Sequence, residues 1–135
     1  MTLEFPSAVP EIPVRDINEA VVYYETKLGF MLDWGGEELG LAGVSNGSCR
    51  MFLASSAYRK ERGNVGPVLT WLNLESKEEV DELFRLWSRS EAKLISEPES
   101  KPWGLHEFMA EDVDGNLFRV FHDFGTPERV DENML

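Results

Sequence analysis

The sequence VLTWLNLESKEEVDELFRLW (residues 68–87) decides the fold class. Val68–Leu74 is rich in β-branched and apolar residues, which predicts a strand. Ser76 and Glu79 have the spacing of a capping box, so we expect a helix to begin there. Apolar residues then recur at helical spacing, which predicts one buried helix face with Trp87 in the core. The residues on this face are Val80, Leu83, Phe84 and Trp87.

The first half of the chain repeats this order of elements. Val9–Val14 is short and β-like, and Pro10 within it favours an edge strand because proline cannot donate to a ladder. Asp16-Ile17-Asn18-Glu19 is a second capping box, 60 residues before Ser76. Apolar residues at helical spacing follow it, and Gly29 is a typical stop. They are Ala20, Val21, Tyr24 and Leu28.

Hairpin signals complete each half. Asn46-Gly47 lies between two strand-like runs of the first half, and Asp114-Gly115-Asn116 lies between two of the second. Short links between strands favour antiparallel pairing, so we predict an α+β fold in which both halves read β-α-β-β-β. The predicted strands after the helices are Phe30–Trp34, Leu39–Val44, Arg50–Ala54, Lys93–Ile95, His106–Ala110 and Leu117–Phe124.

The length of 135 residues predicts a single domain. We place its two repeats at about residues 7–55 and 67–125, with Ser55–Gly66 as the linker and 126–135 as a polar tail. One such module has too small a core to stand alone. The two modules must therefore share a core or pair with a second chain.

Composition excludes several functions. The formal net charge is −12, which should repel nucleic acid and anionic membranes and attract cations. Cys49 is the only cysteine, so no intrachain disulfide can form, and a reducing cytoplasm fits. Met1–Pro6 has no basic stretch before an apolar run, so we expect no signal peptide. No apolar run reaches the roughly 18 residues of a membrane span.

Five motifs carry a family resemblance: Val14-Arg15-Asp16-Ile17, Lys27-Leu28-Gly29-Phe30, Pro102-Trp103-Gly104, Glu107-Phe108 and Asp112-Val113-Asp114-Gly115-Asn116. With them, residues 7–124 resemble the vicinal-oxygen-chelate superfamily of glyoxalases, bleomycin-resistance proteins and dioxygenases, especially its bleomycin-resistance branch. Val113 stands where that branch has proline. The resemblance implies a cleft-shaped mixed sheet and a homodimer. Pro10 matches the proline that accompanies exchange of the first strand between subunits in the family.

The same resemblance argues against a metal. The positions of the family's metal ligands fall on Val9, Met51, Val68 or Leu69, and Arg119. None of these residues is a usual metal ligand. We therefore expect no metal, no cofactor and no catalysis, but sequestration of a small molecule. A regulatory or self-resistance module whose ligand is a local metabolite would have the same sequence features as such a sequestering protein.

The alternative is a metal-dependent lyase, isomerase or dioxygenase of the same superfamily. It would need a nonstandard set of ligands, built from His106 or His122 with Glu107.

Aromatic residues are the leading candidates for ligand contacts. Trp103 matches the family's ligand-stacking tryptophan, and we favour a ligand contact over core packing for it. Both faces of the strand that contains Trp71 mix apolar and polar residues, so cleft and core stay open for Trp71, and we favour the core. Trp34 ends a strand beside Asp33 and Glu38, and an aromatic face beside carboxylates suits a flat cationic or amphipathic ligand. A solvated acidic turn with one half-buried indole explains Trp34 equally well.

The last hairpin supplies the remaining candidates. A two-residue Asp114-Gly115 turn pairs Glu107 with His122. One face of that hairpin should line the cleft, because it carries Arg119 at a family cleft position. His106 on this face has two interpretations. It is a ligand contact or a general acid/base, or it is a sheet histidine without a functional role. We assign no functional role to His122. The residues of this face are His106, Phe108, Ala110, Arg119 and Phe121.

Overall fold

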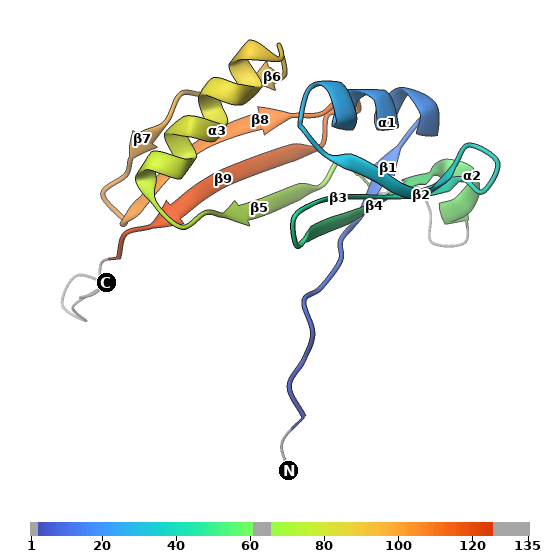
Figure 1. Ribbon diagram of the computed structural model, residues 1–135, viewed down its shortest axis with the longest axis horizontal. Coiled ribbons are helices and arrows are strands. Elements are labelled where there is room, and N and C mark those ends of the chain that lie inside the picture. The colour runs from blue at the N-terminus through green and yellow to red at the C-terminus, as the bar shows by residue number, and fades with distance from the viewer. Residues whose placement is uncertain (1–2, 61–65, 126–135) are drawn as a thin grey trace.

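The computed structural model describes residues 3–60 and 66–125, which form two modules that lie side by side (Figure 1). In the first module, helix α1 covers one side of a four-stranded mixed sheet, sheet A, ordered β1-β4-β3-β2. Strand β1 runs parallel to β4, and the other neighbours are antiparallel. The elements are β1 (Glu11–Val14), α1 (Ile17–Thr26), β2 (Met31–Gly36), β3 (Leu41–Asn46), β4 (Cys49–Ser55) and the short α2 (Ser56–Arg59).

The second module repeats this plan around sheet B, ordered β5-β9-β8-β6, with helix α3 packed on one side. Strand β5 runs parallel to β9, as β1 does to β4. A two-residue strand, β7, pairs with β8 and has no counterpart in the prediction. The elements are β5 (Leu69–Asn73), α3 (Lys77–Arg89), β6 (Lys93–Leu94), β7 (Glu99–Ser100), β8 (Leu105–Glu111) and β9 (Leu117–Asp123). The predicted α+β class and the mixed sheets are confirmed.

Both helices begin at the predicted caps. Asp16 accepts a hydrogen bond from the Glu19 amide at 3.0 Å, and Ser76 accepts one from the Glu79 amide at 3.1 Å. The Glu79 carboxylate in turn accepts from the Glu75 amide at 3.0 Å. These bonds satisfy amides that the first helical turn leaves unpaired.

One core joins the two modules. Trp87 is 3 % exposed, as predicted, and its indole N–H donates to the Leu28 carbonyl of the first module at 2.9 Å. Tyr24 packs edge-on against Phe118, and its hydroxyl donates to Asp112 at 2.8 Å. Burial raises the pKa of the Asp112 carboxyl and raises that of the Tyr24 hydroxyl well above its usual value. Sharing a core in this way meets the need of modules too small to stand alone.

The turn between β8 and β9 corrects the predicted register. Glu111 pairs with Leu117, so five residues rather than two form the connection, and Glu107 faces Phe121 rather than His122. The cause is the Asp112 side chain, whose Oδ1 accepts the amides of Asp114 and Asn116 at 2.8 and 2.9 Å. This closure moves the pairing of β8 with β9 by one residue. As a result, Arg119 and Phe121 share a face with Glu107 and not with His106.

The N-terminal segment runs away from the body of the molecule before β1 (Figure 1). Leu3 and Phe5 on this segment are 81 % and 89 % exposed. No helix among residues 3–60 and 66–125 is long and apolar enough to cross a membrane. The proposed tail at 126–135 lies outside the described residues, as does part of the linker.

Candidate functional site

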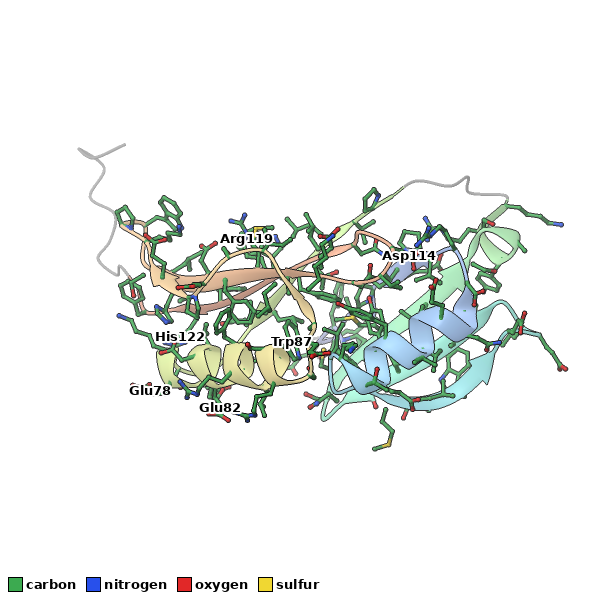
Figure 2. All side chains as sticks on the ribbon, turned by 90° about the horizontal axis from the view of Figure 1, so that it is seen from above. Glu78, Glu82, Trp87, Asp114, Arg119 and His122 are labelled. Carbon is green, nitrogen blue, oxygen red and sulfur yellow. The ribbon has the colours of Figure 1, made fainter. Side chains whose placement is uncertain are left out.

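The side of sheet B opposite α3 carries an ion pair at its centre. Arg119 on β9 lies on this side, with α3, Glu82 and His122 on the other (Figure 2). Arg119 Nη1 lies 3.1 Å from Glu107 Oε1 on β8, and the two side chains are 28 % and 5 % exposed. Because Glu107 pairs with Phe121 and Met109 with Arg119, the two charged residues are diagonal neighbours on one face. We call this side of sheet B the open face.

Aromatic side chains surround the ion pair. The Trp103 indole N–H lies 3.3 Å from Glu107 Oε2, and the Arg119 guanidinium lies 4.9 Å from the centroid of Trp71. Trp71 meets Phe121 edge-on at 5.4 Å. Trp71 is 49 % exposed and Trp103 is 58 % exposed, so both indoles present free surface. The assignment of Trp71 to the core was therefore wrong. We refer to Trp71, Trp103, Glu107, Arg119 and Phe121 as the aromatic platform.

Local backbone geometry holds Trp103 at the edge of this platform. The turn between β7 and β8 closes through Lys101, whose carbonyl accepts the Gly104 amide at 3.0 Å and whose amide donates to Leu105 at 2.8 Å. Gly104 adopts φ of 92°, a conformation that side chains other than glycine rarely tolerate. The Lys101 ammonium lies 5.9 Å from the centroid of the indole. Trp103 is thus presented outward by its turn rather than packed inward.

Three predicted cleft residues face α3 instead, because of the register described above. Phe108 is 1 % exposed and packs edge-on against Phe84 and Trp87, and Ala110 is fully buried. His106 Nε2 lies 2.9 Å from Asp81 Oδ1 on α3, and its Nδ1 lies 2.8 Å from Ser100 Oγ. The placement of His106, Phe108 and Ala110 on the cleft side was wrong. Arg119 and Phe121 do lie on the open face, but their companions are Glu107 and Met109.

A second aromatic group lies on sheet A. The pairing places Glu11, Phe52, Gly43 and Trp34 in one row across its four strands. The Trp34 indole lies over Gly43, where an added Cβ would come within 2.5 Å of it. Trp34 meets Phe52 edge-on at 5.1 Å, and the Arg50 guanidinium lies 5.7 Å from the Phe52 centroid. Trp34 remains 37 % exposed.

The carboxylates predicted beside Trp34 lie on the exposed end of the first module. The pairing register of β2 with β3 changes between Leu32 and Trp34, which places a bulge at Asp33. Asp33 and Glu38 are both exposed. The charged group over the Phe52 ring is the Arg50 guanidinium, a cation.

The residues present do not fit the metal site of the fold family. Arg119 is a cation at one implied ligand position, and Met51 at another is buried on the core side of sheet A. His106 and His122 lie on the helix side of sheet B, away from Glu107 on the open face. Within the described part of the chain, no three His, Cys, Asp or Glu side chains are grouped as metal ligands. The nonstandard set of His106 or His122 with Glu107 is thus divided between two faces.

A family model described as the Glyoxalase/Bleomycin resistance protein/Dioxygenase superfamily matches residues 7–120. The chain belongs to this superfamily. A search of curated proteins finds no matching sequence.

Solved structures agree on the fold at low sequence identity. A glyoxalase/bleomycin resistance protein/dioxygenase from Nocardioides has a TM-score of 0.74 at 20 % identity, covering 96 % of this chain and 93 % of that one. A bleomycin-binding protein complexed with bleomycin has a TM-score of 0.69 at 21 % identity, covering 87 % and 98 %. A lactoylglutathione lyase from Agrobacterium tumefaciens has a TM-score of 0.70 at 19 % identity, covering 88 % and 96 %. These structural neighbours include both a ligand binder and an enzyme.

The sequence missed Glu107 and Trp71 as members of the platform. The signal that would have found them is the Asx turn at Asp112-Val113-Asp114-Gly115-Asn116, because Asp side chains accept amides two residues ahead. With that turn recognised, Glu107 falls on the face of Arg119, and Arg119 pairs laterally with Trp71 on β5.

Proposed function

We propose that this protein binds a flat, amphipathic small molecule on the aromatic platform and sequesters it without chemistry. The observation that carries the proposal is the pair of exposed indoles, Trp71 and Trp103, held around the Glu107–Arg119 ion pair. Aromatic faces bind planar ligands by stacking, and sequestration needs affinity alone. The bleomycin-binding neighbour supports a small-molecule ligand on this fold.

A cationic ligand is the form we favour. The net charge of −12 raises the local concentration of cations around the molecule. Asp33 and Glu38, both exposed, add negative charge on the first module. Arg119 and Lys101 already lie close to the indoles of the platform, so the positive group of the ligand belongs away from them.

We further propose a homodimer that exchanges its N-terminal segments and works in the cytoplasm. The support is the extended segment with exposed Leu3 and Phe5, whose apolar surface a second copy would cover. Native mass spectrometry at micromolar concentration is expected to detect dimers. A monomer alone under those conditions would contradict the exchange.

A thermal-shift screen against cationic and amphipathic compounds tests the binding function. A ligand that binds only the native state raises the melting temperature by mass action. We expect a hit that also quenches tryptophan fluorescence, with the quenching reduced in Trp103→Ala. Hits that act equally on wild type and on this variant would place the ligand elsewhere.

Metal analysis separates this function from the enzymatic alternative. Protein purified without chelator is expected to carry far less than one metal ion per chain. About one equivalent of zinc, nickel, manganese or iron would favour a lyase, isomerase or dioxygenase.

A further inference from the structure

A groove of about 510 Å³ lies at the seam between the modules, apart from the centre of the platform. Its walls come from α3, strand β5, the β3–β4 hairpin and the connection between α1 and β2. Leu28 and Phe30 of the first module line it together with Leu83, Leu86 and Trp87 of α3. Its volume lies within the ~300–1,000 Å³ of typical small-molecule sites, which are also mostly apolar.

Two carboxylates lie along the α3 wall of the groove. Glu79 and Glu82 line it, and none of its lining residues is Lys, Arg or His. Glu79 Oε1 accepts the Glu75 amide, and Glu82 Oε1 pairs with Arg85 at 2.9 Å. Arg85 offsets part of the charge of Glu82, and the negative charge that remains at this exposed wall, chiefly from Glu79, favours a positive group.

Strand β5, at the edge of sheet B, forms another wall of the groove. The Val68 carbonyl and the Leu74 amide bond to β9, at 2.8 and 2.7 Å. Along a strand, the backbone N–H and C=O groups of alternate residues point to the same side. Because Val68 and Leu74 point theirs toward β9, Trp71 and Asn73 point theirs away from β9. Both residues line the groove. Backbone donors and acceptors thus supplement an otherwise apolar wall.

The groove and the aromatic platform are different sites. Trp87 lies on the α3 side of sheet B, whereas Arg119 lies on the opposite side (Figure 2). Trp71 belongs to the edge strand and borders both. Trp103 is not among the lining residues of the groove, so its removal from the platform takes nothing from the groove wall.

We propose that the groove is a second binding site, which takes a hydrophobic monocation. The apolar body of the ligand lies between Phe30 and Leu83, and its positive charge lies near Glu79 and Glu82. The shape and the apolar lining of the groove select the body of the ligand, and the negative charge of Glu79 and Glu82, which Arg85 offsets only at Glu82, selects the sign of its charge. This site does not depend on ligand binding at the platform.

Equilibrium dialysis with tetraphenylphosphonium and tetraphenylborate tests the charge preference, because the two ions share shape and differ in sign. Wild-type protein is expected to bind the phosphonium more tightly. Glu79→Gln/Glu82→Gln keeps both side-chain shapes and should weaken phosphonium binding about threefold to tenfold. Glu78→Gln/Glu97→Gln removes the same charge from exposed positions outside the groove and should leave binding within about twofold.

Cys49 locates the bound ion, because it lines the groove and is the only cysteine of the chain. Burial raises the pKa of its thiol, so modification by N-ethylmaleimide is followed at mildly alkaline pH. The phosphonium is expected to slow modification of Cys49 in wild type and in Trp103→Ala alike.

Several outcomes would overturn the site. Equal affinity for both ions, or equal weakening by the control pair, would remove the role of Glu79 and Glu82. Loss of phosphonium binding in Trp103→Ala would assign the ion to the platform. Modification of Cys49 that speeds up on dilution would show that a second copy covers the groove. If Cys49 is inert even without phosphonium, the dialysis comparison of the two double variants decides alone.

Discussion

Arg119 Nη1 lies 3.1 Å from Glu107 Oε1, and this ion pair joins β9 to β8 in the middle of the open face. Glu107 is almost fully buried, and Trp103 supplies its second polar contact. Arg119 also stacks on Trp71. The pair therefore positions both indoles that we propose as the ligand-binding surface.

Arg119→Leu is expected to destabilise the fold by about 3 kcal/mol, because it leaves the Glu107 carboxylate buried without its cation. Glu107→Leu/Arg119→Leu should recover at least about 1 kcal/mol of that loss, since it removes both charges. Urea unfolding of the two single variants and the double variant measures the coupling. Additive losses would show that the pair is energetically irrelevant.

Trp103→Ala should weaken binding of the screened ligand by about 1–3 kcal/mol, or about fivefold to more than a hundredfold in Kd, by analogy with base–aromatic stacking. Its free energy of unfolding should change little, because the indole is 58 % exposed. Trp87→Ala is the matched control, and loss of this buried indole should cost about 3–5 kcal/mol of stability. Ligand titration and urea melts together decide. A Trp103→Ala protein with a large stability loss and unchanged affinity would refute the stacking role.

Gly43→Ala should displace the Trp34 indole, because the new Cβ would come within 2.5 Å of it. We expect a stability loss of about 1–3 kcal/mol, the usual cost of overpacking. Tryptophan emission should shift to the red as Trp34 becomes more exposed. Trp34→Leu/Gly43→Ala removes the bulky ring, and its unfolding free energy should match that of Trp34→Leu. A further loss in the double variant would point to strain in the backbone of β3.

Asp112 makes stability depend on pH in a definite direction. Burial raises the pKa of its carboxyl above the ordinary 3.8. The folded state therefore holds the proton more tightly than the unfolded chain, and the protonated carboxyl contributes to the free energy of unfolding. This contribution to stability is fully present below pH 3.8 and is lost as pH rises through the folded pKa. Asp112→Asn lacks the titration. We measure the free energy of unfolding of both proteins by urea melts from pH 3.5 upward. The wild-type value minus the Asp112→Asn value should fall as pH rises. A difference that grows over that range would contradict the raised pKa.

The modular plan could be predicted from local signals. Asp16 and Ser76 cap helices through their own neighbours in the chain, and the stripe containing Val80 and Trp87 follows from helical spacing alone. Hairpins were placed correctly at Asn46-Gly47 and around Gly115. Such features depend on residues a few positions apart, so one sequence suffices to identify them. The family motifs extend the prediction to the mixed sheets.

Only the tertiary structure decided which residues make the candidate site. Asp112 closes the β8–β9 turn while buried against Tyr24, which lies 88 residues earlier in the chain. That closure sets the register, and the register turns His106 and Phe108 toward α3 and Glu107 toward Arg119. Trp71 could be assigned to no face by alternation, because both sides of its strand carry apolar and polar residues. Packing between segments that are distant in the sequence decides which side of sheet B is covered by α3, and those segments meet only in the folded chain.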